Sequence, residues 1–236
     1  SVEEAYKLQR ALRSVREARG EKVIGFKVGY TSKGVRGNHE GIMGLTESVH
    51  GYLWDSESYK SATVVDHRRL AIEGELGVKL LSVDSDDVSE WEVEYEPIIE
   101  IHMAGMDGPK EDDLGRRGLE LIGTNCIHAG VVHSTSTKSC LIGEISLNEV
   151  MTVSVGKKKV EQVTLSELRV GDMLGSVATL SWLLKKLKSE GNQEEALLRE
   201  GAFVICSTPG ALHLVPPGRE VRVEFSGLET SCTAAT

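Results

Sequence analysis

The stretch LAIEGELGVKL, from Leu70 to Leu80, alternates apolar and polar residues along its whole length. Successive side chains of a β-strand point to opposite faces, so this alternation predicts a strand. One face would carry the leucines, the isoleucine and the valine. The other would carry Glu73, Glu75 and Lys79. We therefore expect one face in the core and one face that gathers charge.

The pair Glu73 and Glu75 carries the first functional signal. Two carboxylates on one face of a strand repel each other unless a positive charge lies between them, and a hard divalent cation is a common solution. The neighbouring Gly74 and Gly77 would leave room for such an ion. A solvated strand face that happens to be acidic is the alternative interpretation.

Composition places the chain among ordinary globular proteins. Its 236 residues, 40% of them hydrophobic, can bury a large core, and we expect a single domain over residues 1–236. A formal net charge of −9 without a long basic run argues against nucleic-acid and anionic-membrane partners. Because there is also no apolar run of eighteen residues, we expect a soluble, cytoplasmic protein. The four cysteines are scattered without metal-binding spacing, so we expect reduced thiols.

The first fifty residues predict a helix, a strand and a long loop. Residues 1–20 form the helix, whose apolar stripe is Ala5, Leu8, Leu12 and Val15. A strand over residues 23–30 carries Lys27, which either extends its ammonium into water or binds an anion. Residues 31–48 are rich in glycine and predict a loop that acts as a lid. In this loop Glu40 is either a lid acid/base residue or an exposed residue without a role.

A second acidic residue stands out at Glu100, within the apolar run PIIEIHM from Pro97 to Met103. A carboxylate among isoleucines is costly unless it is paired or bound to a metal, which makes Glu100 a functional candidate. The preceding residues 89–95 fit both a strand and a helix, and we assign them to a helix that Pro97 ends.

The second half of the chain predicts further elements. Residues 119–133 suggest a polar bend in buried surroundings, with Thr124, Asn125 and His128. Strand-like runs follow at 139–146 and 149–155, and the second continues into a hairpin through Gly156. Finally we expect a helix over 177–187, a strand over 202–206 and a last strand around 221–225.

Taken together, these segments resemble the 2-hydroxypenta-2,4-dienoate (2-keto-4-pentenoate) hydratase and 4-oxalocrotonate decarboxylase group of the fumarylacetoacetate hydrolase superfamily. The likeness is carried by AYKLQ (residues 5–9), GFKVGYTS (25–32), the ExE of Glu73 and Glu75, IEI around Glu100, Thr124-Asn125, LSWLLKKL (180–187) and GREVRVEFSGL (218–228). It implies an α+β fold, a mixed β-roll of the fumarylacetoacetate hydrolase C-terminal-domain type with a few flanking helices.

The same resemblance implies a site. Glu73, Glu75 and Glu100 match the three carboxylates that bind one Mg²⁺ or Mn²⁺, and Lys27 matches a lysine that faces the substrate oxygens. Two departures concern the groups around the substrate: Val49 stands where an aspartate is expected, and Ile127-His128 replace small hydroxyl residues. These changes leave the metal ligands in place. Because they alter the groups around the substrate, the resemblance does not determine which reaction is catalysed.

The expected activity is metal-dependent hydration of a short 2-hydroxydienoate or 2-oxo-enoate, in a homo-oligomer whose partner is this small acid. Decarboxylation and C–C hydrolysis are alternatives within the superfamily, and a non-catalytic metal- or oxo-acid-binding protein is the alternative outside enzymes. Catalytic candidates are Lys27, His50, His128 and Glu40. Candidates for substrate binding are Lys27, Thr124, Asn125 and Ser207.

Overall fold

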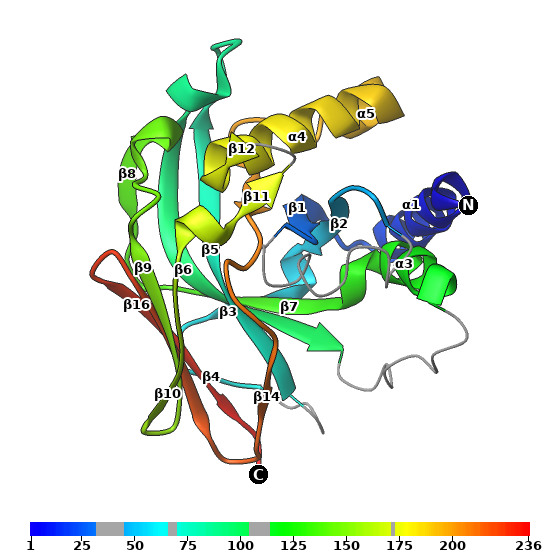
Figure 1. Cartoon of the computed structure of the whole chain (residues 1–236). Helices are drawn as coiled ribbons and strands as arrows, with labels where there is room; N and C mark the ends of the chain where they lie inside the picture. The colour runs from blue at the N-terminus through cyan, green and yellow to red at the C-terminus, as the bar shows by residue number, and fades with distance from the viewer. Residues whose placement is uncertain (32–44, 66–69, 104–113, 171–172) are drawn as a thin grey trace.

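The structure is a computed structural model, and it describes residues 1–31, 45–65, 70–103, 114–170 and 173–236. In these ranges the chain forms a nine-stranded sheet, a five-stranded sheet and flanking helices (Figure 1). The predicted α+β fold, a curled mixed sheet with few helices, is confirmed. Most of the predicted lid over residues 31–48, including Glu40, lies outside the described residues.

The larger sheet contains β1 (Val23–Gly29), β2 (Val49–Trp54), β3 (Ser58–Lys60), β5 (Leu70–Ser82), β6 (Glu92–Met103), β7 (His128–His133), β8 (Lys138–Leu141), β13 (Phe203–Ile205) and β14 (His213–Val215). The smaller sheet contains β4 (Thr63–Val65), β9 (Val150–Val155), β10 (Lys158–Thr164), β15 (Glu220–Phe225) and β16 (Leu228–Ala234). Outside these sheets lie β11 (Arg169–Val170), β12 (Met173–Leu174), α1 (Val2–Ala18), α3 (Leu114–Gly123), α4 (Gly175–Glu190) and α5 (Asn192–Glu195).

The antiparallel pair β5 and β6 is the centre of the larger sheet, and its register sets Glu73 opposite Glu100. The apolar face of β5 packs against the smaller sheet, so that Ile72 and Leu76 are fully buried. A side chain at Gly74 would meet Val153 of β9 at 2.6 Å. This glycine therefore makes room for the second sheet. We had expected it to make room for a cation. Gly77 likewise makes room for the ring of Phe203.

The predicted helix over residues 89–95 is wrong, because residues from Glu92 belong to strand β6. Pro97 does not end an element but lies in the middle of this strand. Proline cannot donate a ladder hydrogen bond, so its position in the sheet matters. On the side of β6 that faces away from β5, Pro97 falls between the residues paired with β8 (92–95) and those paired with β7 (99–102). Pro97 therefore lies at a point where β6 has no paired strand on that side among the described residues, and its missing N–H interrupts no ladder there.

The helix α1 forms as expected, with Ser1 and Glu4 in a reciprocal capping box, but it packs with a different face. Of the predicted apolar stripe only Ala5 is buried: Leu8 has 61% of its surface accessible and Val15 has 49%. The helix instead buries Tyr6 and Gln9. The polar Gln9 is tolerated inside because its amide donates to two backbone carbonyls, of His50 and Ile122.

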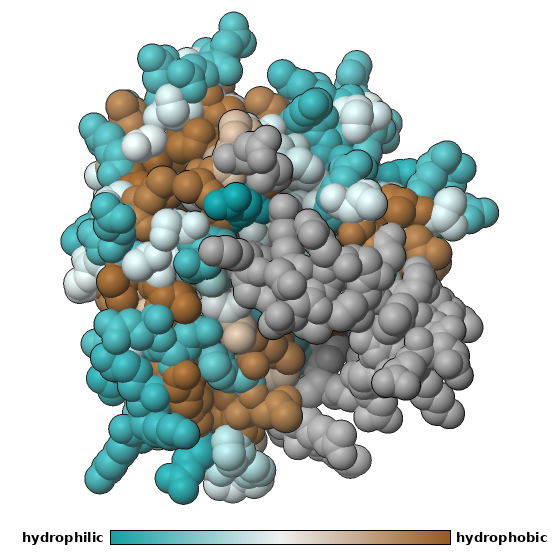
Figure 2. Space-filling view, viewed as in Figure 1, coloured by the Kyte–Doolittle hydropathy of each residue, from teal (hydrophilic) through white to brown (hydrophobic). Residues whose placement is uncertain are grey.

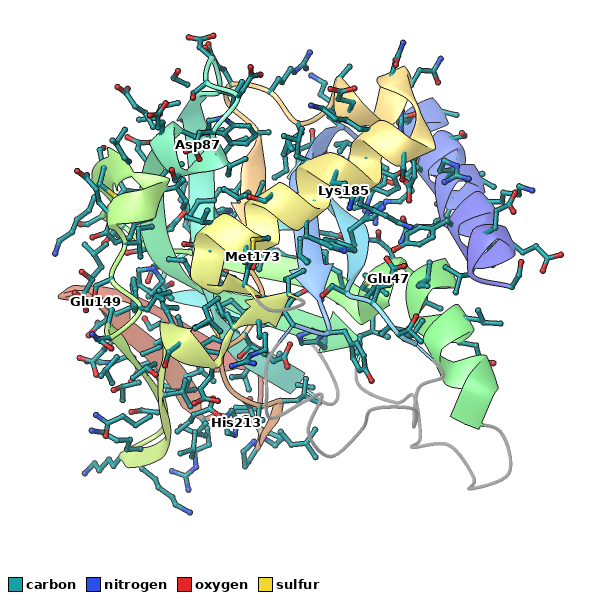
Figure 3. All side chains as sticks on the ribbon, turned by 45° about the horizontal axis from the view of Figure 1, so that its top comes forward. Glu47, Asp87, Glu149, Met173, Lys185 and His213 are labelled. Atoms are coloured by element: carbon teal, nitrogen blue, oxygen red, sulfur yellow. The ribbon has the colours of Figure 1, made fainter. Side chains whose placement is uncertain are left out.

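The hairpin β9–β10 and the strands β13 and β15 confirm the predicted elements, while β16 and α3 were not predicted. In Figure 3 the helix α4, which carries Lys185, lies in front of the strands of the larger sheet. Figure 2 shows hydrophilic surface at the top, over the turn that joins β5 to β6. There Asp87 accepts a hydrogen bond from the backbone N–H of Ser89, so the acidic turn is a helical cap.

Two further properties follow from the described ranges. No helix in them combines the length and the apolar character that crossing a bilayer requires. All four cysteines lie in the described part of the chain and are unpaired, and Cys126, Cys206 and Cys232 are buried.

Substituting Gly25 tests the parallel contact between β1 and β13. A Cβ atom at Gly25 would lie 1.7 Å from the carbonyl oxygen of Phe203, so the two strands would have to separate. We expect Gly25→Ala to lower the free energy of unfolding by roughly 2–4 kcal/mol in urea denaturation. The control is Gly29→Ala in the same strand, whose Cβ would meet nothing closer than 3.7 Å. Equal stability of the two variants would contradict this contact.

Candidate metal centre

Four donor groups converge on one face of the β5–β6 pair: Glu73 and Glu75 on β5, and Glu100 and His102 on β6. Each offers one ligand atom, and these atoms lie within 4.8 Å of one another. Glu75 and Glu100 are 1% and 0% exposed, which excludes the alternative of a solvated acidic strand face. The buried oxygens Glu75 Oε2 and Glu100 Oε2 have no hydrogen-bond partner among the described residues. Such orphaned carboxylate oxygens are what a bound cation would satisfy.

The other oxygen of Glu100 is held from two sides. Lys27 Nζ lies 2.5 Å from Glu100 Oε1, and His128 Nδ1 lies 2.7 Å from the same oxygen. Lys27 is 3% exposed, so it does not extend into water. Its ammonium also donates to the carbonyl oxygen of Cys126 at 3.3 Å. Glu100 is thereby fixed with Oε1 bound and Oε2 free.

Burial and neighbouring charges shift the pKa values of the two buried carboxylates of the cluster in opposite directions. Burial and the charges of Glu100 and Glu73 raise the pKa of Glu75 well above its usual value. Burial also acts to raise the pKa of Glu100, but the charge of Lys27, with contributions from the neighbouring histidines, outweighs burial and holds that pKa well below the usual value. For Lys27, burial acts to lower the pKa, and the neighbouring carboxylates reverse the effect and raise it. Without a cation, the cluster therefore favours a protonated Glu75 beside an ionised Glu100.

The described residues border a cavity of about 1080 Å³ beside this cluster. Lys27, Glu73, Glu75 and His102 line one part of it. The remaining wall includes apolar residues from several elements, among them Val49, Leu121, Ile127 and Leu212, and the acidic residues Glu161 and Glu167. The cavity is large enough for a small organic acid.

Of the predicted substrate-binding residues, Lys27 and Ser207 line the cavity, whereas Thr124 and Asn125 do not. The hydroxyl of Thr124 donates to the carbonyl of Glu120 at the end of α3. The amide of Asn125 is fully engaged with β2: its Oδ1 accepts from the Tyr52 N–H at 2.6 Å, and its Nδ2 donates to the Tyr52 carbonyl at 2.8 Å. Both side chains therefore make backbone hydrogen bonds outside the cavity lining, and their role in substrate binding stays a prediction.

His128 also lies outside the cavity lining. Its ring contacts Glu100, a candidate metal ligand, and its catalytic role stays a prediction. This position is next to Ile127, which does line the cavity.

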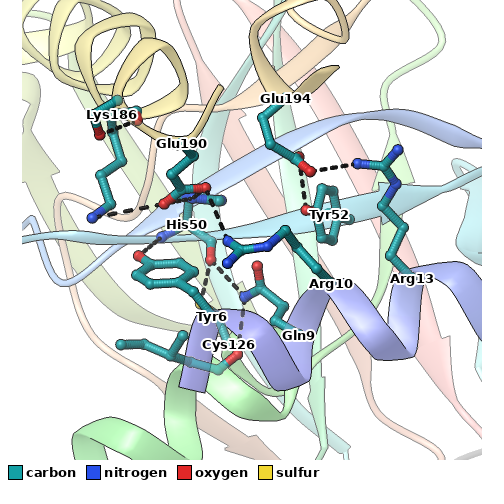
Figure 4. Close-up of polar contacts among 12 residues, drawn as sticks. Tyr6, Gln9, Arg10, Arg13, His50, Tyr52, Cys126, Lys186, Glu190 and Glu194 are labelled. Atoms are coloured by element: carbon teal, nitrogen blue, oxygen red, sulfur yellow. Dashed lines mark hydrogen bonds and ion pairs between the residues drawn. The ribbon is translucent and has the colours of Figure 1, made fainter. Parts of the chain in front are cut away.

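The predicted catalytic residue His50 does not line the cavity. Its ring lies in a polar network with residues of α1 and α4 (Figure 4). Its ring stacks on Tyr6, with the ring centroids 4.8 Å apart, and Nε2 lies 3.2 Å from both carboxylate oxygens of Glu190. Arg10 and Lys186 each come within 3.7 Å of the same carboxylate. His50 therefore stabilises the packing of two helices on β2, while its neighbour Val49 faces the cavity.

Sequence reasoning missed His102, although it lies in the PIIEIHM run that drew attention to Glu100. The signal was present, because residues two apart on a strand share a face. The side chain is 3% exposed and lines the cavity next to Glu73.

The fold is a curled mixed sheet of the fumarylacetoacetate hydrolase type, and four possible metal ligands lie on one face of its central strand pair. A scan against protein-family models finds no match for the chain, and a search of curated proteins finds none either. Solved structures do match. The 4-oxalocrotonate decarboxylase from Pseudomonas putida G7, complexed with magnesium and adipate, has a TM-score of 0.79 at 20% identity, covering 99% of this chain and 86% of that one.

Two further structures share the fold. Fumarylpyruvate hydrolase from Pseudomonas aeruginosa, in complex with Mn²⁺ and pyruvate, has a TM-score of 0.63 at 15% identity, with 89% and 88% of the two chains covered. The 5-carboxymethyl-2-hydroxymuconate delta-isomerase from Mycobacterium smegmatis has a TM-score of 0.58 at 11% identity, with 90% and 78% covered. At these identities the likeness establishes the fold.

Removing the charge of Glu190 tests the network around His50. Burial acts to raise the pKa of Glu190, but the hydrogen bond from His50 and the charges around it outweigh burial and lower the pKa. A lowered pKa stabilises the folded state above the unfolded pKa of about 4.3, and this contribution is lost as the pH falls through the folded value. We expect Glu190→Gln to cost roughly 1–3 kcal/mol at pH 7.

The measurement is urea denaturation of wild type and variant at pH 7 and at several values below pH 4. The difference between the two proteins should shrink as the pH falls. Glu200→Gln, at an exposed position outside this network, is the control and should match wild type throughout. A difference that stays constant down to low pH would show that Glu190 contributes no ionic stabilisation.

Proposed function

We propose that this protein is a divalent-metal-dependent enzyme that adds water to a short 2-hydroxydienoate or 2-oxo-enoate. The observation that carries the proposal is the pair of buried, unpartnered oxygens on Glu75 and Glu100, beside a cavity that also exposes Lys27. An unused buried acidic cluster would only destabilise the fold. This cost argues against a purely structural role.

Glu73, Glu75 and Glu100 would hold a Mg²⁺ or Mn²⁺ ion. When bound, such an ion supplies Lewis-acid stabilisation of negative charge that develops on a substrate oxygen. The three carboxylates come from strands fixed in register, so the donor atoms are positioned before an ion arrives.

Lys27 would bind the substrate. A protonated lysine has three N–H donors. Among the described residues, Lys27 donates to the Cys126 carbonyl and forms an ion pair with Glu100, and its ammonium would also donate to a carboxylate or 2-oxo oxygen of a bound acid. Since the ammonium is buried, this interaction is little screened by water. Ser207 offers a hydroxyl at the same cavity, and Glu40 stays a predicted acid/base residue.

The wall of the cavity favours a substrate with an uncharged tail. Among the lining residues that the structure describes, Lys27 is the only lysine or arginine, whereas Glu161 and Glu167 are acidic. A second carboxylate on the substrate would meet this acidic wall. The apolar side chains of Ile127 and Leu212 instead fit a short hydrocarbon tail.

Decarboxylation is the second candidate, because the 4-oxalocrotonate decarboxylase structure aligns with 99% of this chain. That structure holds adipate, a dicarboxylate. Charge on the substrate tail therefore separates the two candidates. The predicted single domain, cytoplasmic location and homo-oligomer stay predictions.

Metal binding and turnover can be tested together. At a metal concentration of about 100 times Kd, Mn²⁺ should stabilise the protein by about 2.7 kcal/mol and raise Tm by roughly 5–10 °C. Turnover is followed as loss of the ultraviolet absorbance of 2-hydroxypenta-2,4-dienoate. Glu75→Gln should lose both effects, and Glu92→Gln, exposed on the same sheet, should keep both. Metal stabilisation without turnover of any short 2-oxo acid would instead favour a binding protein.

The charge of the tail is tested by comparing kcat/KM for this monocarboxylic dienoate and for its dicarboxylic analogue, 4-oxalocrotonate. We expect the first to be preferred by at least about tenfold, or about 1.4 kcal/mol. Glu161→Gln should reduce the preference, because it removes one negative charge from the wall. If 4-oxalocrotonate is the better substrate and releases carbon dioxide, the decarboxylase assignment replaces the hydratase.

A further inference from the structure

His102 completes a compact set of donors on the β5–β6 pair. Glu100 and His102 are two residues apart on β6 and face the same side as Glu73 and Glu75 of β5. His102 Nε2 lies 2.8 Å from Glu73 Oε2 and 3.6 Å from Glu100 Oε2. The imidazole therefore belongs to the set of donor atoms that lie within 4.8 Å of one another.

The imidazole is buried without a hydrogen bond. His102 is 3% exposed, and among the described residues neither Nδ1 nor Nε2 has a hydrogen-bond partner. The short separation from Glu73 does not have the angles of a hydrogen bond. A buried ring nitrogen without a partner is costly, so its orientation toward three carboxylates needs an explanation.

A simple ion pair explains the arrangement less well than a shared ligand does. An imidazolium paired with Glu73 would donate a directed N–H to the carboxylate, which the geometry lacks. A neutral imidazole instead presents a lone pair on Nε2, and it does so on the side where Glu75 Oε2 and Glu100 Oε2 are also unpartnered.

We infer that His102 is a fourth protein ligand of the cation, through Nε2. This inference rests on the metal site of the proposed function, but not on the hydratase reaction. Three carboxylates alone suit Mg²⁺, Ca²⁺ and Mn²⁺, whereas an imidazole favours transition ions such as Fe²⁺, Co²⁺, Ni²⁺ and Zn²⁺. The chain should therefore bind Co²⁺ more tightly than Mg²⁺, and His102 should set that preference.

Isothermal titration calorimetry of the metal-free full chain tests the preference with CoCl₂ and MgCl₂. Relative to wild type, His102→Val should weaken Co²⁺ binding by at least about tenfold and Mg²⁺ binding by less than about threefold. Valine suits a strand and provides no donor atom. His213→Gln, on β14 outside the donor cluster, is the matched control and should leave both affinities unchanged.

A spectroscopic measurement on the wild-type chain removes the dependence on a variant that may misfold. Electron spin echo envelope modulation of the Mn²⁺ complex should contain the ¹⁴N couplings of a coordinated imidazole, and the His213→Gln complex should contain them too. Absence of these couplings in wild type would overturn the inference, as would equal loss of Co²⁺ and Mg²⁺ affinity in folded His102→Val.

The outcomes separate this inference from the proposed reaction. Imidazole couplings in a protein that turns over no 2-oxo acid would support the role of His102 and overturn the hydratase. Turnover with a Mn²⁺ complex that lacks the couplings would do the opposite. A wild-type chain that binds neither ion would overturn both.

Discussion

The register of β5 against β6 is the constraint on which the site depends. Because Glu73 lies opposite Glu100, the donor-bearing positions of both strands fall on one face, and the opposite face is committed to the core. A shift of one residue would turn the carboxylates into the apolar space between the sheets. The hydrophobic contacts of Ile72 and Leu76 with the second sheet therefore also fix where the charged groups lie. Fold stability and site geometry are set by the same strand pairing.

A strained turn places Lys27. Residues Asn125, Cys126 and Ile127 all have positive φ, at 58°, 56° and 53°, a region that costs on the order of 1–3 kcal/mol per non-glycine residue. The hydrogen bonds of Asn125 to both backbone groups of Tyr52 offset this cost and cover the outer edge of β2. The same turn orients the Cys126 carbonyl so that it accepts a hydrogen bond from the Lys27 ammonium. The lysine is thus positioned by a segment almost one hundred residues away in sequence.

Sequence periodicity was sufficient for the features that depend on one strand. The alternation in Leu70–Leu80 predicted the face of Glu73 and Glu75, and the isoleucines around Glu100 indicated a buried carboxylate. It was insufficient where the partner elements decide. His50 and Val49 are adjacent residues of a strand covered on both sides, so only the positions of α1 and α4 determine which one meets the cavity. The buried face of α1 was misjudged because Gln9 and its two carbonyl partners are not a hydrophobic signal.

Charge balance explains why a buried lysine belongs in a cluster of acids. Three ionised carboxylates and Lys27 together carry two negative charges, which a divalent cation would balance. Without the cation, the raised pKa of Glu75 shows a different compensation, in which a proton takes the place of part of that charge. Protons and metal ions therefore compete for the same oxygens. Once the cluster is neutral, the carboxylate of the proposed oxo acid would add an uncompensated charge, and Lys27 is the one lysine or arginine among the described lining residues that would meet it.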